Sequence, residues 1–168
     1  MRAGKAATLG IALILVYVGL TGCASTAHKE AQAAPSPQNV TPGSTFTIIK
    51  GFVIPDGDTG VYFQDTHLYT EDDIQPDYPY CQLKSGDARG ENLGSGVFTV
   101  TGVDYDEEGT GAKGMDVSVT GIRLQKEASG KIYRLNCMLP MQSHGARFVT
   151  PAEVQGAVDG YMTLKDAP

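Results

Sequence analysis

The chain has 168 residues, of which 41% are hydrophobic, and its 13 Lys and Arg stand against 19 Asp and Glu, for a formal net charge of −6. This length leaves room for one domain with one core. The negative charge argues against nucleic acid and against anionic lipid headgroups as main partners. Solubility is the simpler consequence of the same charge.

The first 23 residues have the parts of an export signal. Arg2 and Lys5 give a positive start, residues 6–20 form a mostly apolar run, and Thr21 and Gly22 are small residues before Cys23. A helix that spans a bilayer needs about 20 apolar residues, so this run is short for a permanent transmembrane segment. An ordinary secretory signal or a signal anchor, with an incidental cysteine, is the alternative.

The four residues Leu20-Thr21-Gly22-Cys23 resemble the lipobox of bacterial lipoproteins. The resemblance implies that residues 1–22 are a signal peptide cleaved after Gly22, and that Cys23 receives a diacylglyceryl group and an N-terminal fatty acid such as palmitate. The next residue is Ala24 rather than Asp, which in this family favours the outer membrane over the inner membrane. We therefore expect an outer-membrane lipid anchor with the remaining chain facing the periplasm.

A flexible tether is expected between the anchor and the folded domain. Residues 23–43 are rich in Ala, Ser, Pro and Gln and show no apolar periodicity, so they bury too little surface to offset the cost of ordering. Twenty such residues have a root-mean-square reach of about 25 Å. Residues 44–168 are then the periplasmic domain.

Apolar residues in this domain alternate with period two, which indicates strands. A first strand is expected to hold Phe46, Ile48, Phe52 and Ile54, with a break at Gly51, and further strands to cover residues 59–64, 80–83 and 97–105. An acidic, glycine-rich turn follows the last of these. Met115, Val117 and Val119 continue the alternation, and a shift of phase to Ile122 beside Gly121 predicts a β-bulge.

Residues 127–130 have the composition of a hairpin loop, and the strand after them places Tyr133, Leu135, Cys137 and Leu139 on one face. One helix is expected from residue 151, because Thr150 is a good N-cap, Pro151 suits the first turn and Glu153 completes a capping box. Gly160 ends it before a last short strand. The fold class is therefore mainly β, a small antiparallel sandwich or open barrel with one short C-terminal helix.

Cys81 and Cys137 lie in strand-like surroundings of an exported domain, so we expect one disulfide between them. Neither belongs to a Cys-x-x-Cys motif, which disfavours redox chemistry. Residues 65–80 are the least regular part of the domain and carry Tyr69, Tyr78 and Tyr80. These tyrosines are expected either to form a contact patch for a partner or to cap the open end of the barrel.

Tests for catalytic or metal chemistry leave no candidate, so we expect no enzyme activity, no cofactor and no metal. His28, His67 and His144 show no ligand spacing, and Ser143-His144 lacks a nucleophile elbow. Residues 104–109 match the start of a calcium loop, but Met115 stands where a bidentate carboxylate is required.

The domain also resembles small proteobacterial envelope lipoproteins, in Val61-Tyr62-Phe63-Gln64, in Tyr78-x-x-Cys81, in the Val-rich strand and in Leu135-x-Cys137. This resemblance carries no activity with it. The expected function is a non-enzymatic outer-membrane lipoprotein that acts as an interaction or structural module and contacts another envelope protein or the cell wall. The alternatives are a β-barrel that binds an apolar ligand or a lipid, and a small hydrolase of envelope polymers.

The replacement Cys23→Ser should abolish fatty-acid labelling, because the lipid is attached through the cysteine thiol. Metabolic labelling with a fatty-acid probe, followed by electrophoresis, measures this. Thr26→Ser is the control and should label like the wild type. Equal labelling of wild type and Cys23→Ser would contradict the lipobox assignment.

Overall fold

The structure, a computed structural model, describes residues 39–54, 60–85, 91–145 and 147–168. Cys23 and His28 lie outside the described residues. Eight strands form one antiparallel sheet in the order β10-β1-β7-β8-β9-β5-β3-β4. Their bounds are β1 (Thr45–Ile48), β3 (Gly60–Gln64), β4 (His67–Tyr69), β5 (Tyr80–Lys84), β7 (Gly96–Thr110), β8 (Asp116–Lys126), β9 (Ile132–Pro140) and β10 (Met162–Lys165).

The remaining elements are short. Strands β2 (Phe52–Val53) and β6 (Asn92–Leu93) pair with each other, and two single-turn 3-10 helices, η1 (Glu71–Asp73) and η2 (Ala112–Gly114), interrupt the connections. Helix α1 (Met141–His144) is one turn long, and α2 (Pro151–Val158) has two turns. A composition of many strands and one short C-terminal helix confirms the mainly β prediction.

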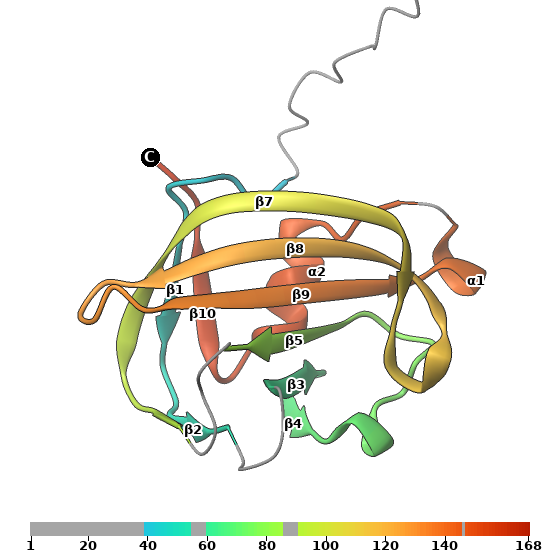
Figure 1. The fold of residues 1–168 in the computed structure, drawn as a ribbon, viewed down its shortest axis with the longest axis horizontal. Coiled ribbons are helices and arrows are strands. Elements are labelled where there is room, and N and C mark those ends of the chain that lie inside the picture. The colour runs from blue at the N-terminus through green and yellow to red at the C-terminus, as the bar shows by residue number, and fades with distance from the viewer. Residues whose placement is uncertain (1–38, 55–59, 86–90, 146) are drawn as a thin grey trace, which may run out of the picture. The chain divides into compact units, whose positions relative to one another are not determined.

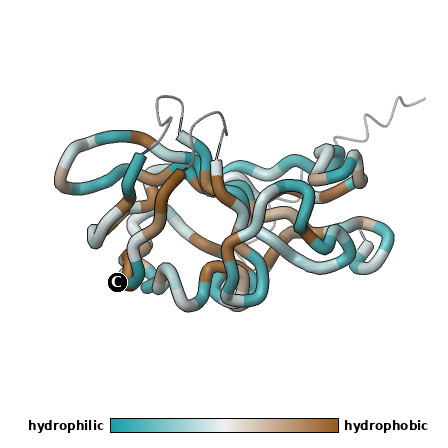
Figure 2. The backbone as a smooth tube through the Cα atoms, turned by 90° about the horizontal axis from the view of Figure 1, so that it is seen from below, coloured by the Kyte–Doolittle hydropathy of each residue, from teal (hydrophilic) through white to brown (hydrophobic). Residues whose placement is uncertain are grey.

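The large sheet curls into a half-barrel around the core (Figure 1). Seen from below, the backbone curves round the interior of the half-barrel (Figure 2). Phe46, Phe98 and Leu135 have no exposure and belong to the core. Helix α2 packs against β10 at one end of the sheet and against β3 and β5 near the other. The helix therefore covers the side that the curled strands leave open, and the fold is an open barrel rather than a sandwich.

Helix α2 begins as the sequence predicts. The Thr150 side chain accepts a hydrogen bond from the backbone N–H of Glu153, and the Glu153 carboxylate accepts one from the backbone N–H of Thr150. Val154, Ala157 and Val158 are buried, as expected. The domain begins earlier than residue 44, because Val40 is 4% exposed within the core. The predicted tether boundary at residue 43 is therefore corrected to before Val40.

The predicted bulge in the strand around Gly121 is wrong. Strand β8 pairs with β9 without interruption from Val117 to Gln125, and the register shifts lie in β7 instead. Ile122 belongs to the inner core, whereas Val117 belongs to a second apolar cluster on the outer face of the sheet. The alternation of apolar residues along β8 changes phase because the apolar side chains lie on the outer face at Val117 and on the inner face from Ile122.

The predicted acidic turn after residue 105 is also wrong, because β7 continues to Thr110. Asp106 and Gly109 pair with Val119 and Val117 of β8, with one extra residue in β7 between them. Ladder hydrogen bonds with β8 hold this segment extended although its composition favours a turn. Tertiary pairing overrides a weak local preference here.

The outer apolar cluster consists of Tyr62, Ile74, Tyr80, Ala112, Val117 and Met138. Two segments cover it, one carrying η1 and the other η2, and the Lys113 ammonium joins them by donating to the Ile74 carbonyl at 2.9 Å. Gln64 is buried and holds the first segment, since its amide donates to the Gln75 carbonyl and accepts from the Gln75 N–H. The part of the sheet beneath η1 and η2 is thus buried on both faces.

Cys81 and Cys137 form the predicted disulfide. The two residues lie directly opposite each other on β5 and β9, with Cα atoms 4.0 Å apart, and both face the inner core. Since 56 residues separate them in sequence, the bridge removes a large amount of conformational freedom from the unfolded chain.

Reducing this disulfide should lower the free energy of unfolding by roughly 2–4 kcal/mol, because the cross-link restricts the unfolded chain. Denaturant unfolding of the oxidised and reduced protein, with the thiols alkylated after reduction, measures the difference. The Cys81→Ala/Cys137→Ala variant is the control, and its stability should not respond to reductant. Coincident unfolding curves for oxidised and reduced wild type would contradict this role.

Candidate functional site

Three basic residues form a row across the outer face of the sheet. Lys84 on β5 lies opposite Arg134 on β9, and Arg134 lies opposite Arg123 on β8. Like charges placed directly opposite each other destabilise a sheet. Asp104 on β7 forms an ion pair with Arg134, and no other ion pair to this row exists within the described residues. The row therefore concentrates positive charge on this face, with Lys84 and Arg123 left without an ion-pair partner among the described residues.

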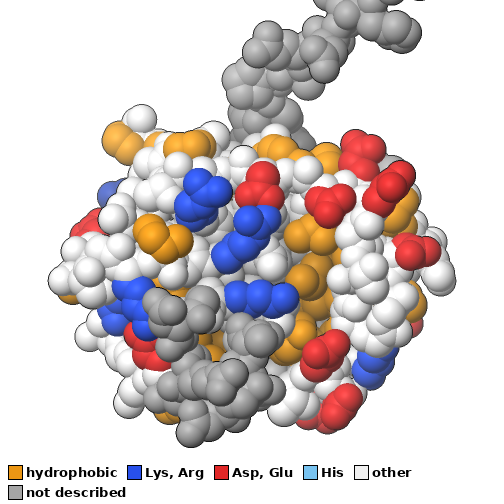
Figure 3. Space-filling view, in the orientation of Figure 1, with side chains coloured by type: hydrophobic (Ala, Val, Ile, Leu, Met, Phe, Trp, Pro, Cys, Tyr) orange, Lys and Arg blue, Asp and Glu red, His pale blue; other side chains and the backbone are white. Residues whose placement is uncertain are grey.

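A groove lies beside this basic row, towards the end of the sheet that η1 and η2 cover. Figure 3 views this face and shows a column of basic side chains, then a strip of hydrophobic ones, then acidic side chains beyond. Along the strands, the basic row is followed by Asn136, Gln82 and Tyr62, which are again cross-strand neighbours. We call this feature the outer-face groove; its floor is Tyr62, Gln82 and Met138.

The outer-face groove contains a cavity of about 170 Å³. Glu71 from η1, Lys84 from β5 and Thr110 from the end of β7 contribute to its walls. Gly111 also borders it, and a side chain at that position would collide with the Tyr80 hydroxyl. The absence of a side chain at Gly111 thus lets the η2 segment approach the sheet and close one end of the cavity.

The groups that line this cavity are strongly polar. Gln82 is only 4% exposed, yet its amide makes no hydrogen bond to another residue of the described chain. Neither Lys84 nor Glu71 has an ion-pair partner among those residues. An ammonium, a carboxylate and an amide therefore face one small space, and all three are available to a ligand or to water.

The predicted tyrosine patch needs correction. Tyr80 has no exposure, and its hydroxyl accepts a hydrogen bond from the Ala112 N–H at 2.6 Å. Burial raises the pKa of this hydroxyl, with Glu71 adding to the effect although the Ala112 hydrogen bond opposes it. Tyr69 is half-buried against the outer apolar cluster, and Tyr78 is 56% exposed. Only Tyr78 thus offers a large contact area, and Tyr80 supports the outer face from beneath.

The structure does not bring the other sequence candidates together. His67 is exposed and its Nδ1 lies 2.6 Å from the Asp65 carbonyl oxygen, while His144 is half-buried in α1. Asp104 and Asp106 lie on a strand rather than in a loop. In the part of the chain that is described, no three His, Cys, Asp or Glu residues are arranged to hold a metal, and no helix has the length and apolar character to cross a membrane.

A second cavity, of about 500 Å³, lies beside helix α1. Glu108 from β7, Asp116 from β8, and Met141 and Gln142 from α1 line it. It is wider and more open than the first cavity, and none of these four side chains has a low exposure. We therefore treat the outer-face groove as the main candidate site.

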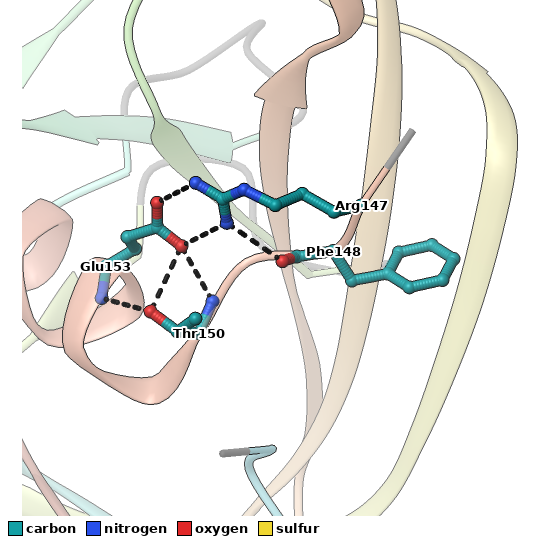
Figure 4. Close-up of polar contacts among 4 residues, drawn as sticks. All are labelled: Arg147, Phe148, Thr150 and Glu153. Atoms are coloured by element: carbon teal, nitrogen blue, oxygen red, sulfur yellow. Dashed lines mark hydrogen bonds and ion pairs between the residues drawn. The ribbon is translucent and has the colours of Figure 1, made fainter. Parts of the chain in front are cut away.

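A separate polar cluster holds the segment before α2 (Figure 4). Arg147 donates two hydrogen bonds to the Glu153 carboxylate, at 2.8 and 2.6 Å, and a third to the Phe148 carbonyl at 3.2 Å. The Arg147 hydrogen bonds lower the pKa of Glu153 to about 2; burial opposes this shift, and the hydrogen bonds from Thr150 reinforce it. The Phe148 ring points away from this cluster and packs on Tyr105 of β7, so one short segment connects α2 to the sheet.

Sequence reasoning missed the outer-face groove. Lys84, Arg123 and Arg134 each alternate with core residues, so their outward direction was visible in the pattern. Their alignment depends on strand register, which the sequence did not show. Comparisons of the sequence with protein-family models and with curated proteins, and of the structure with solved structures, found no match. The chemistry of the groove is thus the basis for a function.

The replacement Glu153→Gln should destabilise the protein by about 1–2 kcal/mol at pH 7, allowing for solvent around the half-exposed Arg147. Because folding lowers the pKa of Glu153, its carboxylate stabilises the folded protein at pH values above the ordinary pKa of 4.5. This contribution is lost as the pH falls through the folded-state pKa of about 2. Unfolding measured between pH 7 and pH 2 should show the two proteins converging. The exposed Glu107→Gln is the control, and a difference that does not depend on pH would contradict the assignment.

Proposed function

We propose that the protein is a non-enzymatic lipoprotein, anchored to the outer membrane through Cys23, whose periplasmic β-domain binds another component of the cell envelope. The lipobox and the signal-like residues before it support the anchor and the location. The row of Lys84, Arg134 and Arg123 beside the outer-face groove is the observation that carries the binding role.

The basic row favours an acidic partner. The whole chain has a net charge of −6, so three aligned basic side chains on one face are a local exception to its surface. Complementary charges on a partner would remove the repulsion within the row and would steer the two surfaces together. Acidic groups of this kind occur on envelope proteins and on the peptides of the cell wall, which are the partner classes expected from the sequence.

The alternative of a barrel that holds an apolar ligand finds less support. The inner face carries Phe63, Leu83 and Leu124 with no exposure, and these side chains pack into one core. Ser118 and Thr120 point into the same interior with hydroxyls that have no hydrogen-bond partner among the described residues. Two hydroxyls within a packed core do not make a chamber for a lipid.

The hydrolase alternative would need convergent acids or a Ser-His pair in a groove, and Ser143-His144 is the pair that the sequence offers. Ser143 is exposed and His144 half-buried in the single turn of α1, and the described residues contain no hydrogen bond between their side chains. A nucleophile needs a base within hydrogen-bond reach and a group that orients that base. The outer-face groove, in contrast, offers groups suited to recognition.

Photo-crosslinking in cells tests the binding role. A crosslinking residue at the exposed position Ile132, on the outer face of β9, should capture a partner with the full-length protein. The double replacement Lys84→Glu/Arg123→Glu should reduce the crosslinked product about tenfold, since two charge pairs of roughly 0.7 kcal/mol each amount to a factor of ten.

The matched control is Lys50→Glu/Lys165→Glu, which changes the net charge by the same amount outside the basic row. It should crosslink like the wild type. An equal loss in both double variants would assign the effect to net charge, and no loss in either would overturn the basic row as the contact surface.

A further inference from the structure

We infer that the cavity of the outer-face groove binds the carboxyl end of a peptide that carries an amine close to that end. This inference deepens the proposed binding role, because it names a ligand for one part of the same face. It depends on the three polar groups that line the cavity, which are Lys84, Gln82 and Glu71.

The size of the cavity favours the terminal residue of a peptide ligand. Pockets that enclose a whole small molecule usually measure about 300–1,000 Å³. The cavity measures about 170 Å³ and lies in an open groove, so it has room for a group of roughly one amino-acid residue. The rest of a longer ligand can then continue along the outer-face groove, over Asn136 and towards the basic row.

The charges at the cavity select the chemical groups of that end. Lys84 is half-buried with no ion-pair partner in the described part of the chain, and a free carboxylate is the ligand group that best pairs with it. Glu71 stands on η1 next to Asp72 and Asp73, and this acidic turn favours an amine on the same ligand. A peptide end with a carboxylate and a nearby amine satisfies both charges.

Gln82 gives the third point of recognition. A glutamine amide donates and accepts hydrogen bonds at once, and a peptide bond offers a matching acceptor and donor. Gln82 lies between Tyr62 and Asn136 in strand register and lines the cavity, and no hydrogen bond joins its amide to another of the described residues. Because this amide borders the cavity, it is available to the last peptide bond of a ligand.

Two sources share this chemistry, namely the peptides of the cell wall and the C-terminus of an envelope protein. Cell-wall peptides end in D-Ala, whereas protein C-termini carry L-residues. The stereochemistry of the last residue therefore distinguishes the sources, while the free carboxylate, the last amide and the amine are common to both.

Binding of synthetic peptides to the full-length protein in detergent tests the inference by calorimetry or fluorescence anisotropy. The probes are Ala-Lys-Ala with a free carboxylate, the same peptide ending in D-Ala, and the C-terminal amide and Lys-acetylated forms of each. The free acid should bind at least about tenfold more tightly than its amide, as expected for one charge-assisted contact. Acetylation of the lysine should also weaken binding.

Variants of the protein should show the same dependence. Lys84→Met keeps the length of the side chain and should remove the preference for the free acid, while Gln82→Leu should weaken all probes. Lys126→Met, a half-buried cation at the end of β8, is the matched control and should bind like the wild type. If Gln82→Leu does not fold, the comparison of free acid and amide on the wild type still decides the matter.

Each outcome is informative. A free-acid preference that Lys84→Met removes supports the inference, and the better of the D-Ala and L-Ala probes identifies the source. Equal binding of acid and amide, or no binding of any probe, overturns it. If crosslinking at Ile132 still depends on the basic row in that case, the proposed binding role stands with a different ligand; if both fail, the whole face is excluded.

Discussion

A sheet that curls without closing leaves one side of its core open to water, and the structure of this protein depends on how that side is covered. Helix α2 spans the opening and buries Val154, Ala157 and Val158. Its Gln155 amide donates to the Met162 carbonyl and accepts from the Leu164 N–H. The helix thus satisfies the free edge of β10 with a side chain, which protects an edge strand from pairing with other chains.

Because α2 covers the inner face, the outer face is free to differ along its length. Near η1 and η2 it is a second small core, and further along the same strands it is wet and basic. Strand β8 passes from Val117, which is fully buried, to Arg123, which is exposed. The outer-face groove lies at this boundary, where buried polar groups and open surface meet.

The disulfide stabilises the part of the sheet on which the groove is built. Cys81 precedes Gln82, and Cys137 follows Asn136, so the bridge joins the two strands directly beneath the groove floor. Tyr80 and Ala112 hold the rim by a buried hydrogen bond. A floor and a rim fixed in this way lose little freedom when a ligand binds, which favours affinity.

The sequence by itself determined the features that depend on near neighbours or on one buried face. Thr150, Pro151 and Glu153 predicted the start of α2, and alternation predicted the inner faces of β5 and β9, on which Cys81 and Cys137 meet. Only the tertiary structure decided what the second face of each strand contacts. Period-two alternation separates two faces but does not say whether the outer one is wet, because that depends on segments far away in sequence. The η2 segment covers Tyr80, whose hydroxyl accepts a hydrogen bond from the Ala112 N–H. The register of three strands aligns Lys84, Arg134 and Arg123.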